Sequence, residues 1–379
     1  MQSRLTLFHS LTPLTLGHAP GATAWILTDG QTLLEQGTGN GWQQAISRHR
    51  LESSQVLDGS ALYLSEGFTD IHCHGGGGVA FENAPELDAA LEIHAASGTS
   101  GTIASLVANP VNELERTMNK LARSIDADLS ASGARLRGIH AEGPYLSPLH
   151  RGAHNPDFLI RPTPDQVEAL YEASQGHLRQ ITLAPELDTG FATLQRCLEL
   201  GIRVAVGHTD ADYDTAKAAF DEGASLLTHT YNAMRPLHHR SPGPVAAAVD
   251  SPHVTLEVIA DGVHVHAPLV RAAFAMASGR IALVTDAMAA TGCADGHYML
   301  GSLDVEVLDS VAKISGTDTI AGSTLTLGAA VQKAVAFGIP LADAVQAATV
   351  TPRIALGLCA RESGLNLLDS AGQLVRTFR

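Results

Sequence analysis

Cysteine is scarce in this sequence: the 379 residues include four, and no two of them form a Cys-x-x-Cys pair. This argues for a reducing compartment and against a disulfide framework. Long apolar runs are also lacking, since no stretch approaches the ~20 residues that span a bilayer. The first residues, MQSRLTLFHSLTPLTLG, lack the basic start and unbroken apolar segment of a signal peptide. We therefore expect a cytoplasmic protein with no membrane partner.

Positive charge is under-represented as well. Lys and Arg number 24 against 39 Asp and Glu, so the formal net charge is −15 at pH 7. A strongly acidic chain repels phosphate backbones and anionic lipids, and we expect no nucleic-acid partner. A small anionic substrate stays open, because a local group of Arg and His side chains can override the overall field. Histidine, by contrast, is abundant, with 18 residues.

The pattern of predicted elements changes near Gly67. Residues before about 60 read as short strands with turn signals, whereas later strands alternate with helical patterns. Such alternation is typical of a parallel sheet built from β-α-β units. Eight repeats predict an α/β fold, a TIM-type (β/α)8 barrel. The eight candidate strands cover residues 68–74, 100–108, 135–142, 180–186, 203–208, 224–229, 254–261 and 281–286.

The two ends of the chain are expected to form a smaller domain. A hairpin pattern over residues 297–314 and two helical patterns follow the eighth strand. The last residues, GLNLLDSAGQLVRTF, read as strands that can rejoin the N-terminal segment. The prediction is a small β-sandwich domain from residues 1–64 and 356–379, and a barrel from residues 65–355.

Ionisable side chains stand where several of these strands end. In the stretch GFTDIHCHGGGG, His72 and His74 share one face and Cys73 points to the other, because alternate residues of a strand point the same way. The strand ends of a TIM barrel meet at one rim, where its reacting groups lie. A histidine or a carboxylate also ends the third, fifth, sixth and eighth strands: Glu142, His208, His229 and Asp286.

A single histidine at a strand end is more often structural than a ligand. Four imidazoles and two carboxylates at one rim, however, predict a catalytic metal site, and nitrogen and oxygen donors favour Zn, Fe, Mn or Co over Ca or Mg. Asp286 could be a helix cap or a surface carboxylate. At the eighth strand end it is better placed as a metal ligand and general base. The Cys73 thiol is then a packed core group rather than a redox group.

Together these residues resemble the amidohydrolase superfamily and, within it, the family of N-acetylglucosamine-6-phosphate deacetylases. Many amidohydrolases use a carbamylated lysine as a bridging ligand, whereas this family has a glutamate where Glu142 stands. The resemblance implies metal-dependent hydrolysis of the acetamide of N-acetylglucosamine 6-phosphate to glucosamine 6-phosphate and acetate. The motifs run from about Gly67 to Gly357: IHCHGGGG, HAEGPYLSPLHRGAHNPDF, AVGHTDA, THTYNAMRPLHHRSPG, IADGVHV, LVTDAM and DTIAGSTLTL.

The resemblance also implies a ligand set for one or two divalent metal ions per subunit, Zn or Fe before Mn or Co. One ion would be held by Glu142, His208 and His229. A second would be held by His72 and His74 together with Glu142 and Asp286.

Substrate contacts are implied in the same way. His154 would face the acetamide carbonyl and act in catalysis beside Asp286. The phosphate and sugar would contact Asn232, Ala233, Arg240 and His264. A homodimer is implied too, since in this family the loop with Arg240 can reach the neighbouring subunit.

The cationic residues of the chain are also consistent with a phosphosugar substrate. RPLHHRSPG, residues 235–243, is the richest group of cationic side chains after the barrel begins, and a guanidinium suits phosphate. The same loop could instead be a solvated basic surface.

Three other functions stay open from the sequence. A deacetylase for another N-acetylhexosamine 6-phosphate, such as the galactosamine epimer, would need the same groups. An amidohydrolase acting on a cyclic amide is disfavoured by HAEGP and by the HHRSPG loop. A non-catalytic barrel scaffold is disfavoured because decay removes ligands, and all six are retained.

Overall fold

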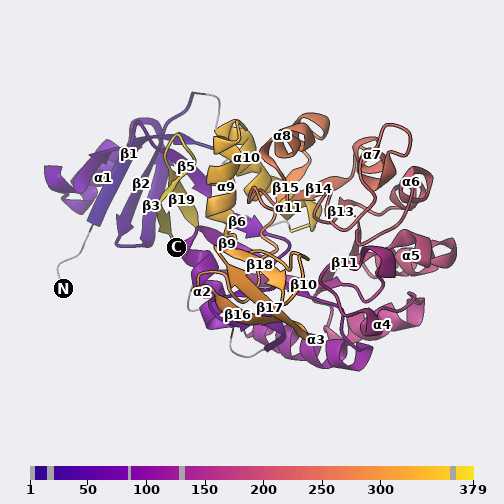
Figure 1. The fold of residues 1–379 in the computed structure, drawn as a ribbon. Helices are drawn as coiled ribbons and strands as arrows, with labels where there is room; N and C mark the ends of the chain where they lie inside the picture. The colour runs from indigo at the N-terminus through magenta and orange to yellow at the C-terminus, as the bar shows by residue number, and fades with distance from the viewer. Residues whose placement is uncertain (1–4, 15–20, 84–86, 128–132, 359–363) are drawn as a thin grey trace.

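The computed structural model describes residues 5–14, 21–83, 87–127, 133–358 and 364–379. Figure 1 shows a barrel ringed by helices, with a layer of strands from both ends of the chain beside it. The predicted fold class is confirmed by this arrangement.

The barrel is one sheet of eight parallel strands whose neighbours follow chain order. Its strands are buried along most of their length because helices cover their outer face, as expected of a parallel sheet. The barrel is closed by the residues that follow its first and eighth strands. Asp286 N donates to His72 O at 2.8 Å, and His74 N donates to Ala287 O at 2.7 Å. The strands are β6 (Phe68–Asp70), β9 (Thr99–Leu106), β10 (Arg135–Glu142), β11 (Leu178–Leu183), β12 (Arg203–Val206), β13 (Leu226–Leu227), β14 (Thr255–Val258) and β15 (Ile281–Leu283).

Most of these strands end earlier than their sequence pattern predicts. The residues that follow them leave the ladder, since His208, His229 and Asp286 take positive φ values of 46°, 27° and 50°. A residue with a side chain is uncommon in this region, and such strain clusters at functional sites. The backbone therefore turns at the residues that carry the ionisable groups.

Helices alternate with these strands and form the outer ring in Figure 1. The clearest amphipathic example is α3, whose buried residues Leu114, Met118 and Leu121 recur at helical spacing. No helix among the described residues is both long and apolar enough to cross a bilayer. The helices are α2 (Asp88–Ala96), α3 (Val111–Asp126), α4 (Pro164–Ala173), α5 (Ala192–Glu199), α6 (Tyr213–Asp221), α7 (Gly243–Val249), α8 (Ala267–Met276), α9 (Leu327–Ala336), α10 (Leu341–Ala348) and α11 (Val350–Ala355).

Strands from both ends of the chain share one sheet outside the barrel, as predicted. Its central strand, β1, pairs with β2 and β4 through its first half and with β5 near its end, and β5 in turn pairs with β19. A small core that includes Phe8, Leu64 and Phe378 lies on the sheet, and α1 (Trp42–His49) packs beside Trp25. The strands are β1 (Leu5–Pro13), β2 (Ala24–Asp29), β3 (Thr32–Thr38), β4 (Val56–Asp58), β5 (Tyr63–Glu66), β19 (Leu365–Leu368) and β20 (Leu374–Phe378).

The segment predicted as one hairpin is a three-stranded antiparallel sheet, so that prediction is wrong in strand number. The strands are β16 (Gly296–Leu300), β17 (Leu303–Leu308) and β18 (Val311–Ile314). Asp309 and Ser310, with φ values of 51° and 63°, form a second tight turn of the kind that joins hairpin strands. Val305, Val307 and Ala312 pack with Met288 at the end of the barrel.

Candidate active site

Four imidazoles surround one carboxylate at the barrel rim. Glu142 ends β10, and its Oε1 lies 3.1 Å from His208 Nε2, 3.2 Å from His229 Nε2 and 3.4 Å from His72 Nε2. Its Oε2 lies 3.2 Å from His74 Nε2. The predicted set is therefore brought together with one carboxylate between both pairs of histidines.

Asp286 adds a second carboxylate to this group. Its Oδ1 lies 3.2 Å from His74 Nε2 and 3.7 Å from His72 Nε2. Asp286 is 8 % exposed, whereas Glu142 is 3 % exposed, so both carboxylates are removed from bulk water. All six residues predicted as ligands thus meet at one place.

Three of the four imidazoles are held in orientation by a hydrogen bond at Nδ1. His74 Nδ1 lies 3.1 Å from Ser105 O, and His208 Nδ1 lies 2.9 Å from His150 O. A carbonyl can only accept, so each Nδ1 carries a proton and each Nε2 is directed toward the carboxylates. His72 Nδ1 lies 3.0 Å from Glu257 Oε2, which has the same effect.

Charge reinforces the arrangement. Burial raises the pKa of Glu142, but the charge of His72 and hydrogen bonds from His154, His208 and His229 outweigh burial and hold that pKa well below its usual range. Burial lowers the pKa of His74, but hydrogen bonds to Asp286 and Glu142 outweigh it and raise the pKa to about 10. The carboxylates therefore stay anionic and retain protons on nearby imidazoles, which a cation can displace.

His154 lies beside this group with a different character. Its Nε2 is 3.5 Å from Glu142 Oε2, and its Nδ1 accepts a hydrogen bond from Ala108 N at 3.1 Å. Burial lowers the pKa of His154 to about 4, so the ring is neutral at pH 7. His154 can therefore offer an Nε2–H donor beside the carboxylates.

The glycines after the histidine pair allow the backbone to form a tight hairpin. Gly75–Gly76 pairs with Val79–Ala80 in a tight hairpin, β7 with β8. A Cβ on Gly75, whose φ is +156°, would lie 2.2 Å from Val79 O. The chain therefore turns tightly beside the site, and this turn requires glycine at position 75.

Cys73 points away from the site, as its alternation predicts. Its Sγ lies 3.3 Å from His94 Nε2 within the barrel core, and burial raises the pKa of the thiol to about 12. The residue is a packed thiol.

The donor set fits a divalent transition metal. Four imidazole nitrogens and two carboxylates converge, and ligand atoms from His72, His74 and Glu142 lie within 4.8 Å of one another. Imidazole and carboxylate donors of this kind suit Zn, Fe, Mn or Co.

Comparison with known proteins gives the same assignment. The family model described as "Amidohydrolase family" matches residues 63–361. The chain belongs to the amidohydrolase family.

Amidohydrolases of one kind are prominent among its relatives. A mutant of N-acetyl-D-glucosamine-6-phosphate deacetylase from Mycobacterium smegmatis, solved with N-acetyl-D-glucosamine-6-phosphate, superposes with a TM-score of 0.87 at 37% identity, covering 99% of this chain and 98% of that one. N-acetylglucosamine-6-phosphate deacetylase from Vibrio furnissii is 36% identical over 78% of this chain and 74% of its own. N-acetylgalactosamine-6-phosphate deacetylase from Escherichia coli O157:H7 is 34% identical over 80% of each chain.

The amidohydrolase site opens into a pocket of about 440 Å³. Among the predicted substrate residues, His154, Asn232, Ala233 and His264 line it. Asn232 Nδ2 donates to His229 O at 3.1 Å, which holds the loop that carries both residues. A volume of this size is typical of a small-molecule site.

Arg240 is placed differently from the other predicted substrate residues. It is exposed and does not line the pocket of this chain as far as the described residues show. Another member of the cationic loop, Arg235, is already paired with Asp210, with nitrogen–oxygen distances of 2.9 and 2.7 Å. Within one chain, therefore, the loop offers less positive charge to the pocket than its composition suggests.

Sequence reasoning missed several contributors to the site. Leu300, at the end of β16, and Asp318, Thr319 and Ile320, which follow β18, line the pocket. The motif DTIAGSTLTL contains three of these residues but indicates no chemistry by itself. Glu257 was missed because it lies inside a strand rather than at its end.

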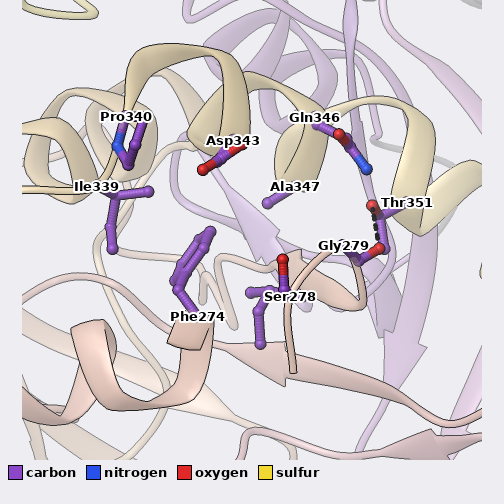
Figure 2. A pocket seen from close by; sticks show the side chains of 10 residues that line it. Phe274, Ser278, Gly279, Ile339, Pro340, Asp343, Gln346, Ala347 and Thr351 are labelled. Atoms are coloured by element: carbon purple, nitrogen blue, oxygen red, sulfur yellow. Dashed lines mark hydrogen bonds between the residues drawn. The ribbon is translucent and has the colours of Figure 1, made fainter. Parts of the chain in front are cut away.

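A second hollow lies at the opposite end of β15. Figure 2 shows it between α8 and the α10–α11 segment, with Phe274, Asp343 and Gln346 pointing into it. Its volume is about 50 Å³, and neither histidine nor a cationic side chain is among the described residues that line it. It lacks both the size and the groups needed for a phosphosugar site.

Proposed function

We propose that this protein hydrolyses the acetamide of N-acetyl-D-glucosamine 6-phosphate and releases acetate and D-glucosamine 6-phosphate. The observation that carries the proposal is that Asp286 and His154 flank one cluster, each close to it: Asp286 Oδ1 is 3.2 Å from His74 Nε2, and His154 Nε2 is 3.5 Å from Glu142 Oε2. A base and a neutral hydrogen-bond donor therefore face one pocket.

One or two divalent ions would be held here, with Zn or Fe preferred and Mn or Co next. Glu142, His208 and His229 would hold one ion, and His72 and His74, with Glu142 and Asp286, would hold the other. When bound, such an ion supplies Lewis acidity, which acidifies water and polarises a carbonyl.

Asp286 would move the proton. It is anionic at neutral pH, because the charge of His72 and a hydrogen bond from His74 outweigh its burial and lower its pKa. It would accept a proton from the attacking water and return it to the departing nitrogen, which cannot leave as an anion.

His154 would stabilise the oxyanion that forms from the acetamide carbonyl. Its Nε2–H is oriented before substrate binds, since Nδ1 is engaged by Ala108 N. Preorganised donors of this kind avoid the cost of reorganisation during the reaction.

The phosphate and sugar would be held at the far side of the pocket by Asn232, Ala233 and His264. We propose that Arg240 completes this part from the second subunit of a homodimer, because in its own chain it is exposed and outside the pocket lining. The phosphate would then position the substrate, at a distance from the bond that breaks.

The glucosamine configuration is preferred for one reason. The neighbour solved with N-acetyl-D-glucosamine-6-phosphate is 37% identical to this chain and the Vibrio furnissii N-acetylglucosamine-6-phosphate deacetylase is 36% identical, whereas the relative named for the galactosamine epimer is 34% identical. A phosphorylated sugar is charged and does not cross a lipid bilayer, so it stays in the cell interior. This favours a cytoplasmic site of action.

The test is acetate release from both epimers by purified protein, before and after metal removal and reloading. We expect turnover of N-acetylglucosamine 6-phosphate that disappears with a chelator and returns with Zn²⁺ or Fe²⁺. Preference for the galactosamine epimer would overturn the substrate assignment, and no acetate from either would favour the scaffold alternative.

A further inference from the structure

A third carboxylate, Glu257, lies beneath the cluster and has no part in the steps above. It stands on β14 and is fully buried. Its Oε2 is 3.0 Å from His72 Nδ1 and accepts from His229 N at 3.3 Å, and its Oε1 accepts from Gln180 Nε2 at 2.7 Å. Both oxygens therefore face donors.

Such a group is unusual inside a barrel. Branched apolar side chains normally fill this space, and a buried carboxylate is costly unless it is paired. Gln180 on β11 donates to Glu257 on β14, and Glu257 contacts His72, two residues beyond the end of β6. Two hydrogen bonds therefore link three segments of the barrel that are not neighbours in the sheet. The linkage ends on a side chain of the ion-binding cluster.

His72 differs from the other three imidazoles in what holds it. His74 and His208 direct Nδ1 at neutral backbone carbonyls, and His229 Nδ1 has no hydrogen-bond partner among the described residues. Only His72 of this group meets a carboxylate at Nδ1. A carboxylate behind an imidazole fixes the ring and makes its other nitrogen a stronger ligand.

We propose that Glu257, held in place by Gln180, is a positioning residue that fixes His72 with Nε2 toward Glu142 and keeps a divalent ion at the His72–His74 half of the site. The inference rests on the proposed function only in requiring that the cluster binds such an ion. Occupancy of this half of the site then depends on a residue below it.

The test measures metal binding without substrate. Zn²⁺ and Co²⁺ dissociation constants and stoichiometry are determined by chelator competition for wild type, Glu257→Gln and Glu257→Met. We expect the ion bound by His72 and His74 to be held about 10- to 100-fold more weakly in both variants. In ¹⁵N-histidine spectra of the Zn²⁺-loaded protein, the Nδ1–H resonance of His72 should shift in Glu257→Met, because the carboxylate that accepts from it is lost.

Two further variants make the result decisive. Gln180→Met leaves Glu257 in place but removes its support, and we expect a smaller loss of affinity. Thr182→Val removes a buried hydrogen bond to His140 in the same interior and should bind metal as wild type does. Wild-type affinity in Glu257→Gln and Glu257→Met would overturn the inference; if neither folds, wild-type affinity in Gln180→Met would do so.

These readouts separate the two proposals. Wild-type protein that binds metal but releases no acetate would overturn the proposed function, and the dissociation constants would still decide the role of Glu257. An active enzyme with unchanged metal binding in the variants would overturn the role of Glu257 alone.

Discussion

The backbone N–H of Ala108 donates to Nδ1 of His154 over 3.1 Å. A backbone amide can only donate, so the single proton of the neutral ring lies on Nε2. His154→Ala should therefore lower kcat by about 10²- to 10³-fold, as loss of one oxyanion donor does. Metal content, measured by mass spectrometry, should be unchanged, and the exposed His297→Gln should be silent. Normal turnover in His154→Ala would remove this residue from the reaction.

Asp286→Asn should separate proton transfer from metal binding. Four histidines and Glu142 remain as donors, so metal content should stay nearly intact, while kcat should fall by about 10²- to 10⁴-fold. Steady-state turnover and metal analysis of the same sample check both points. Asp343→Asn, in the small hollow of Figure 2, is a matched control that should behave as wild type. Near-normal turnover in Asp286→Asn would contradict its role as the base.

Arg240→Ala should weaken binding of the phosphorylated substrate selectively. A charge-assisted hydrogen bond contributes about 1.5–3 kcal/mol, so KM should rise by about 10- to 100-fold. An unphosphorylated N-acetyl sugar should be turned over as by wild type, and Arg116→Ala, on the outer helix α3, is the control. Equal losses on both substrates would argue against a phosphate contact.

Mixed dimers test whether Arg240 acts across the interface. When Arg240→Ala and Asp286→Asn subunits are combined, a cross-subunit arrangement creates one site with neither change. Activity should then reappear on mixing two impaired variants. If mixing restores nothing although mixed dimers form, Arg240 does not serve the neighbouring site.

His264 should make substrate binding dependent on pH. Burial lowers the pKa of His264, but its hydrogen bond to Asp261, 2.6 Å from Nδ1 to Oδ2, outweighs burial and raises the pKa above its ordinary value. The imidazolium persists to higher pH, so KM for the phosphosugar should be low below the raised pKa and increase above it. Asp261→Asn should move this increase to lower pH. A KM profile that Asp261→Asn leaves unchanged would exclude the pair as its cause.

Metal removal should have a pH signature as well. The pKa of His74 is raised to about 10 without a cation, so its proton stabilises the metal-free fold fully below about 6.5, and that contribution is lost as pH rises through about 10. The Tm of chelated protein should therefore fall across this window more than that of metal-loaded protein. Because the ion displaces the proton, metal affinity should rise with pH. Parallel Tm profiles for the two forms would contradict this.

The barrel and the convergence of the six candidate ligands were predictable because their signals are local. His72, His74, Glu142, His208, His229 and Asp286 each stand at the end of a predicted strand, and parallel strands bring such positions to one rim. Cys73 was placed correctly by the two-residue period of a strand alone. The division of the chain at residues 64 and 355 stays a prediction.

Other parts of the site depend on contacts that no local pattern encodes. Glu257 and Gln180 are 77 residues apart and meet only because β11 and β14 face each other across the barrel interior. The second turn of the three-stranded sheet has no clear sequence signal, because Asp309 and Ser310 both adopt positive φ although neither is a glycine. The composition of residues 235–243 likewise does not reveal that Arg235 is paired with Asp210.

The three-stranded sheet of β16–β18 separates the part of the molecule that shapes the pocket from the part that carries the proposed reacting groups. This separation has an evolutionary consequence. The barrel strands and the loops that follow them supply every group proposed to react, whereas this sheet, with its own small core around Val305 and Val307, and the segment after it line part of the pocket. Substitutions between residues 296 and 322 can therefore reshape the cavity while the ligands stay in register. In related barrels, changes in this sheet and the segment after it can therefore alter which sugar is accepted, while the residues proposed to bind metal and to react are unchanged.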